Sequence, residues 1–181
     1  MAIPRPAHYP IHMGSWSNFY VIVGSSAGAL TGLQFVVITL VAQSQHSSSM
    51  REIRAFGSPT VVHFCLTLLV SALMCMPWRS AVLLAWMLAA VGVAGLIYGA
   101  SVVYHARKQT GYEPEPEDWL WYIVAPLILY GALIAAGVLL LCRLEAAFFV
   151  TAAVALGLLF LGIRNSWDTV TYVAITRSST S

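Results

Sequence analysis

The side chains best suited to ligand or ion chemistry in this sequence lie at the edges of long apolar stretches. His63 and His105 stand near the ends of two consecutive stretches. Two histidines on facing helices can ligate a haem or a metal. No second histidine pair and no neighbouring carboxylate accompanies them, so hydrogen bonding at the membrane boundary is the simpler interpretation. A haem between His63 and His105 is the alternative, and no metal site is predicted.

A second group of charged side chains follows the last apolar stretch. Arg164 and Asp168 are four residues apart, the spacing that pairs side chains along one helix face. The pattern predicts an ion pair at the depth of the lipid headgroups. Alternatively, Arg164 reaches into the bundle toward His63 or His105, so that these four residues form a cytoplasmic-boundary cluster that acts as a gate or contacts lipid headgroups.

The first apolar stretch carries uncharged polar side chains. Gln34 stands near its middle, between Thr31 and Thr39. An amide in lipid is costly and is expected to face protein or water. Two roles stay open: Gln34 bridges to another helix, or the three side chains line a polar pathway. No Asp, Glu, Lys or Arg stands near the centre of any stretch, which argues against a proton-coupled pump or transporter.

The same stretch repeats a glycine every four residues, at Gly24, Gly28 and Gly32. In membranes, small residues let helix backbones approach closely, and this packing drives association where the hydrophobic effect is absent. The repeat therefore predicts tight helix packing on one face. The partner is either another helix of the same chain or a second copy of it.

Membrane-spanning helices must position these side chains. The composition is 59% hydrophobic and only 9% charged, whereas soluble domains carry about 25% charged residues. A span needs about 20 apolar residues, and a helix pairs its own backbone groups in lipid. The sequence thus predicts an all-α polytopic transmembrane bundle of about five spans, in which 1–18 are an extramembrane arm, 19–177 the bundle and 178–181 a polar tail. The five stretches are Phe19–Val41, Pro59–Met76, Ala81–Tyr104, Trp119–Leu141 and Ala146–Ile163.

The connections between stretches predict helix ends and orientation. Pro59 suits the first turn of the second helix, and residues 164–177 either continue the last span or lie at the interface. Two short turns, Pro77–Ser80 and Cys142–Glu145, predict tight antiparallel hairpins. Cationic residues are more numerous on the side of the membrane opposite these two turns, which places the C-terminus in the cytoplasm and the N-terminus outside. The proposed cytoplasmic side holds Arg51, Arg54, Arg107, Lys108, Arg164 and Arg177. The outer side holds Arg5, Arg79 and Arg143.

The charge and the cysteines limit the function classes. A net charge of +2 is too small to indicate a nucleic-acid partner. The cysteines show no zinc spacing, and a disulfide between Cys75 and Cys142 is an alternative to free thiols. No catalytic motif is present, so the expected partners are the lipid bilayer and either further copies of the chain or another membrane protein. The leading hypothesis is a non-enzymatic homo-oligomer that forms a small pore or channel. The alternatives are an accessory subunit of a larger membrane complex and a haem- or metal-binding redox protein.

Two local patterns carry a resemblance. Phe19-Tyr20 leads into Gly24-x3-Gly28-x2-Thr31-Gly32-Leu33-x-Phe35, and the last stretch ends in Gly162-Ile163-Arg164-Asn165-x-Trp167-Asp168. Together they resemble small multi-span membrane proteins of bacteria. The resemblance covers only the first and last spans. It implies location in the bacterial inner membrane and carries no activity.

Overall fold

The computed structural model describes residues 13–44, 50–107 and 119–178, and these residues form helices joined by two short turns. The helices are α1 (Met13–Ser44), α2 (Met50–Cys75), α3 (Ala81–Arg107), α5 (Ala125–Leu141) and α6 (Ala146–Ser178), with a π-helical turn, η1 (Leu120–Val124), that runs directly into α5. No strand occurs in these ranges. The predicted all-helical bundle is confirmed.

The helices have the length and surface of membrane spans. Four contain apolar segments long enough to cross a bilayer, and the apolar part of α2, Pro59–Cys75, is shorter. Large apolar side chains point outward all around the bundle, among them Ile22, Ile97 and Phe160, each about two-thirds exposed. So much exposed apolar surface is suited to lipid and not to water. The chain is a multi-pass integral membrane protein.

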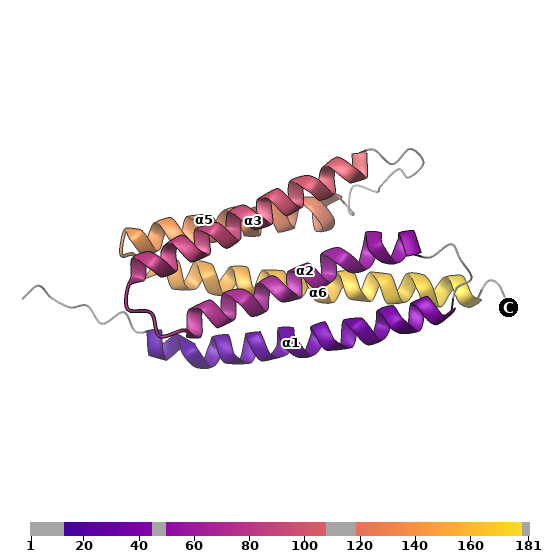
Figure 1. Cartoon of the computed structure of the whole chain (residues 1–181), viewed down its shortest axis with the longest axis horizontal. Coiled ribbons are helices and arrows are strands. Elements are labelled where there is room, and N and C mark those ends of the chain that lie inside the picture. Colours follow the sequence, from indigo (N-terminus) through magenta and orange to yellow (C-terminus); the bar gives the residue numbers. More distant parts are fainter. Residues whose placement is uncertain (1–12, 45–49, 108–118, 179–181) are drawn as a thin grey trace, which may run out of the picture.

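The bundle consists of two antiparallel helix pairs joined by the last helix. α1 packs along α2, and α3 packs along α5, whereas α2 and α3 touch little (Figure 1). α6 lies against both α2 and α5 and so connects the pairs. It is the most buried span: 56% of its apolar segment is buried, against 22% for α1. α6 therefore supplies the centre of the core.

The expected start of the second helix is wrong. α2 begins at Met50, so Pro59 lies inside the helix and not in its first turn. The segment before Pro59 was expected to lie outside the helix, but it contains the good helix formers Met, Arg, Glu and Ala. A proline removes one backbone hydrogen bond and crowds the carbonyl four residues earlier. The rest of α2 retains its helical bonds on both sides of this defect.

The two short turns lie at the same end of the bundle, as the hairpins require (Figure 1). After α5, the amide of Leu144 donates to the Leu139 carbonyl and that of Arg143 to the Leu140 carbonyl, each at 3.0 Å. These two bonds form a Schellman motif, which stops a helix by placing one residue in the left-handed region. Arg143 occupies that position with φ 58°. The turn is thus set by backbone bonds although it lacks the usual glycine.

The π-helical turn has a local cause in Pro126. Proline has no amide to donate, and its ring crowds the carbonyl of residue i−4, here Tyr122. The backbone widens just before it, so that the amide of Ala125 bonds to the carbonyl of Leu120, five residues earlier. Single π turns inside α-helices often occur at functional sites. Here the turn directs Tyr122 and Ile123 toward a pocket between α2, α3 and α5.

Glycines bring α3 and α5 into close contact. A Cβ added at Gly92 would lie 2.8 Å from the Tyr130 carbonyl oxygen, and one at Gly137 would lie 2.7 Å from the Ala85 carbonyl oxygen. At Gly95 it would meet the ring of Tyr130 at 2.5 Å. Real Cβ atoms essentially never come within 3.0 Å of another atom, so a larger residue at any of these points would force its neighbour to shift. The small-residue packing expected of the first span is thus also a feature of α3 and α5.

Candidate functional site

The three glycines of α1 do not share one contact within the chain. A Cβ at Gly24 would lie 2.8 Å from Cβ of Ser71 in α2, whereas at Gly28 and Gly32 it would meet nothing within 4 Å. Residues four apart drift around an α-helix by about 40°, so the three glycines turn progressively away from α2. Gly24 serves packing inside the chain. Gly28 and Gly32 open onto the outer surface of α1.

The polar side chains of α1 also point in different directions. Gln34 is only 3% exposed, and its Oε1 accepts a hydrogen bond of 2.9 Å from Oγ of Ser166 in α6. Thr31 and Thr39 instead donate to carbonyls of their own helix, each at 2.8 Å. Thr39 is exposed, and Thr31 is half-buried. Gln34 therefore joins two helices, while the two threonines satisfy their hydroxyls locally.

Removal of the Gln34–Ser166 bond is expected to weaken the bundle slightly. Hydrogen bonds between membrane helices average about 0.6 kcal/mol and reach about 1.7 kcal/mol in double-mutant cycles. We expect Gln34→Leu and Ser166→Ala each to lower the free energy of unfolding by an amount in this range. The loss in the double variant should be smaller than the sum of the two single losses. Steric-trapping or denaturant unfolding in bicelles would measure it. Additive losses, or a changed ion flux with unchanged stability, would contradict a bridging role.

A buried polar stripe runs along α2, and of its members only His63 was predicted from the sequence to have a role. Thr60, His63, Thr67 and Ser71 are each at most 2% exposed and recur at helical spacing of three or four residues. The hydroxyl of Thr67 donates to the His63 carbonyl at 2.9 Å and approaches the Ala155 carbonyl of α6 at 3.5 Å. The spacing was visible in the sequence. This spacing identifies the face of α2 that packs against the core.

The charged residues at the end of α6 lie beside η1. Nε of Arg164 is 3.6 Å from Oδ2 of Asp168, and its guanidinium carbon lies 4.3 Å from the centre of the Trp121 ring. A cation over an indole face is attractive, whereas a half-exposed ion pair contributes little. The side chain of His105 lies outside the described residues, so the four-residue boundary cluster is not seen as a whole.

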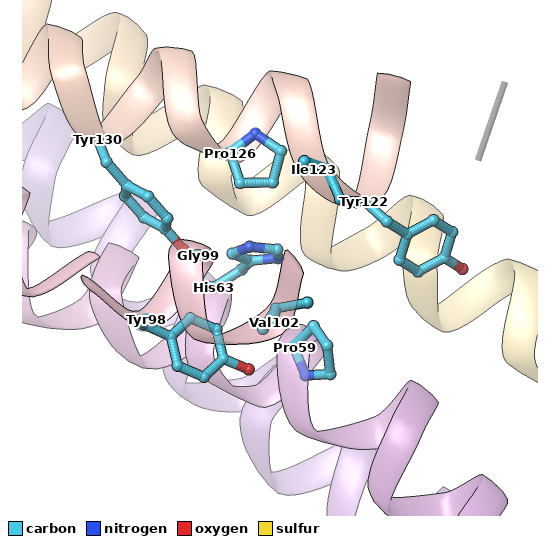
Figure 2. Close-up of a pocket in the computed structure, with 9 residues that line it drawn as sticks. All are labelled: Pro59, His63, Tyr98, Gly99, Val102, Tyr122, Ile123, Pro126 and Tyr130. Carbon is cyan, nitrogen blue, oxygen red and sulfur yellow. The ribbon is translucent and has the colours of Figure 1, made fainter. Parts of the chain in front are cut away.

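His63 lies in a small pocket between α2, α3 and the η1–α5 helix. Figure 2 shows its ring in the middle of the pocket, with the hydroxyl of Tyr130 pointing toward it. The ring centroids are 6.4 Å apart. Neither Nδ1 of His63 nor the hydroxyl of Tyr130 has a hydrogen-bond partner in the described part of the chain, although both atoms are buried. The pocket has room for about one water-sized group. Its lining residues are Pro59, His63, Tyr98, Gly99, Val102, Tyr122, Ile123, Pro126 and Tyr130.

The other residues that could ligate a metal, including the cysteines, are dispersed. Within the described residues no group of three or more His, Cys, Asp or Glu side chains gathers. Cys65, Cys75 and Cys142 are free and exposed, so the alternative of a Cys75–Cys142 disulfide is wrong. Comparison with protein families, curated proteins and solved structures finds no match for this chain. Function must therefore be inferred from the residues and contacts described above.

Proposed function

We propose that this chain is a non-enzymatic membrane protein that works by lateral assembly with further copies of itself, through the outward face of α1. The observation that carries this proposal is the open space beside Gly28 and Gly32. A Cβ added at either position would meet nothing within 4 Å among the described residues. The tightly packed glycines of α3 and α5 show what the same residue does when a helix lies against it.

The surroundings of these two glycines support a helix-packing role. Ser25 and Ala29 lie on the same side of α1 and are exposed, and Gly32 is exposed as well. Large side chains border this strip toward both ends of the helix, with Ile22 66% and Leu33 61% exposed. A shallow groove of small residues between large ones is the surface on which membrane helices cross closely.

The proposed pore lies between copies. Within one chain, the pocket around His63 holds no more than about one water-sized group, which is too little for a path. Closed rings of identical subunits enclose an axis, and this is how a chain of this size forms a path. Exposed Thr39 and Ser25 supply polar groups on the proposed contact face.

Gly28→Leu is expected to separate the copies while leaving each fold intact. The leucine would occupy the groove, and we expect the dissociation constant to rise at least about tenfold, which corresponds to about 1.4 kcal/mol. Native mass spectrometry in mild detergent would measure the subunit number. Gly131→Leu is the matched control, because this α5 glycine is also open. An unchanged oligomer would refute the proposed contact face. A monomeric wild-type chain that co-purifies with a larger protein would favour the accessory-subunit alternative.

We further propose the bacterial inner membrane as the location, with the N-terminus outside and the C-terminus in the cytoplasm. The two turns that carry Arg79 and Arg143 share one end of the bundle with the start of α1 (Figure 1). The end of α3 at Arg107 lies toward the other end of the bundle, and six of the nine cationic residues of the sequence fall on that predicted side. The resemblance to bacterial multi-span proteins supports the choice of membrane.

Cys142 provides a direct test of orientation, because it is exposed in a turn at the proposed outer end. In a variant that keeps only this cysteine (Cys65→Ala, Cys75→Ala), a membrane-impermeant maleimide is expected to label the protein in intact spheroplasts. Inside-out vesicles should give no labelling until they are opened with detergent. The additional change Cys142→Ala should abolish the signal. Labelling confined to inside-out vesicles would reverse the proposed orientation.

A further inference from the structure

The pocket around His63 contains two polar atoms that have no hydrogen-bond partner among the residues that the structure describes. His63 is 2% exposed and Tyr130 is 1% exposed. Nδ1 of the first and the hydroxyl oxygen of the second make no hydrogen bond within residues 13–44, 50–107 and 119–178. Buried polar atoms in folded proteins are nearly always paired, so each such atom calls for an explanation. Two that line the same pocket point to a shared ligand.

The backbone holds both groups in place. The Tyr130 ring lies against Gly95, where an added Cβ would be 2.5 Å from a ring carbon. Its hydroxyl is thereby directed toward His63 (Figure 2). On the other side, the π-helical turn before Pro126 forms the wall that carries Tyr122 and Ile123. The pocket is therefore formed by one helix irregularity and one glycine contact, and not by loosely packed side chains.

The lining determines the kind of group that fits. Of the nine lining residues, eight are apolar or neutral polar and the ninth is His63. Neither an inorganic anion nor a metal cation would therefore find a counter-charge. A phenol hydroxyl donates a hydrogen bond, and a histidine nitrogen donates or accepts according to its tautomer. An oxygen with free lone pairs can accept from both, and a hydroxyl or water oxygen can also donate to the imidazole.

We propose that the pocket binds a single neutral oxygen, that of a hydroxyl, a carbonyl or water, between His63 and Tyr130. The space admits about one such group, so the rest of a larger ligand must lie outside. Tyr98, Val102 and Ile123 are partly exposed at the pocket wall and would border an apolar chain in the bilayer. The oxygen thus comes either from a neutral membrane amphiphile, whose chain remains in lipid, or from water. This assignment does not depend on the proposed assembly through α1.

The amphiphile is tested with 1-decanol, and decane serves as the probe without an oxygen. Decanol at saturation is expected to raise the unfolding midpoint of the wild-type protein in dodecyl maltoside by roughly 5 °C, and decane is not. Tyr130→Phe, which keeps the ring and removes the hydroxyl, should lose this shift. Tyr104→Phe, outside the pocket, should keep it. If Tyr130→Phe does not fold, His63→Leu takes its place in the comparison.

Water is tested by NMR on protein with imidazole-labelled histidine. Magnetisation transfer from water to the His63 ring, assigned by its absence in His63→Leu, is expected if a water molecule is the ligand, and Tyr130→Phe should abolish it. A decanol shift that depends on Tyr130 identifies the amphiphile, and a water signal that depends on Tyr130 identifies water. Either supports the site. The absence of both, or signals unaffected by Tyr130→Phe, would overturn it.

Discussion

Gly137→Leu is expected to prevent α3 and α5 from pairing and so to unfold much of the bundle. The new side chain would begin 2.7 Å from the Ala85 carbonyl oxygen and 3.4 Å from the Ala89 amide nitrogen. These are backbone atoms of a helix and cannot move away alone, so the two helices must separate. Overpacking typically costs about 1–3 kcal/mol and sometimes more. We expect about 3 kcal/mol here because the obstacle is rigid.

Gly131→Leu is the matched control on the same helix. An added Cβ at Gly131 meets nothing within 4 Å, and surface substitutions usually change stability by less than about 0.5 kcal/mol. Thermal or denaturant unfolding in detergent, followed by circular dichroism, would compare the two variants. If Gly137→Leu unfolded at the same midpoint as Gly131→Leu, the close approach of α3 and α5 would be refuted.

Phe64 and Gly162 are expected to compensate for each other's substitutions. Phe64 is 1% exposed, and its ring in α2 contacts the position that a Cβ on Gly162 of α6 would occupy. Phe64→Ala should cost about 3–5 kcal/mol because it leaves a cavity. Gly162→Leu should cost about 1–3 kcal/mol because it collides with the ring. In the double variant, the leucine can fill the cavity, so the loss should be smaller than the sum.

A double-mutant cycle measures this compensation directly. Residues in contact show coupling of about 0.5–3 kcal/mol, and we expect a value in the upper half of that range. Phe160→Ala is the control, because this side chain is 65% exposed on the lipid-facing surface of α6 and should not couple to Gly162. Strictly additive losses for Phe64 and Gly162 would show that α2 and α6 do not pack through this pair.

The spans and turns were predictable from the sequence because lipid imposes a length on every apolar segment. The helix boundaries at Ala81, Leu141 and Ala146 follow from short turns between such segments. The start of α2 was not predictable in the same way, since polarity at a membrane boundary does not distinguish a loop from a helix that extends into the headgroups. The helix-forming residues before Pro59 explain why the segment is helical and not a loop.

The lateral neighbours of each helix were harder to predict. In lipid both the core and the outer surface are apolar, so hydrophobic periodicity does not identify the inner face. Small and polar residues are the better signal: Gly92 and Gly95 lie at the α5 contact, and Thr67 lies at the α6 contact. The meeting of His63 with Tyr130 had no such signal, because it depends on the ring resting on Gly95 and on the widened turn before Pro126.

The central place of α6 has a consequence for biogenesis. α6 follows the other four helices in the chain, yet it is the helix that connects the α1–α2 pair to the α3–α5 pair. During insertion from the ribosome, two hairpins would therefore reside in the membrane side by side, with their inward polar groups uncovered, until the last segment leaves the translocon.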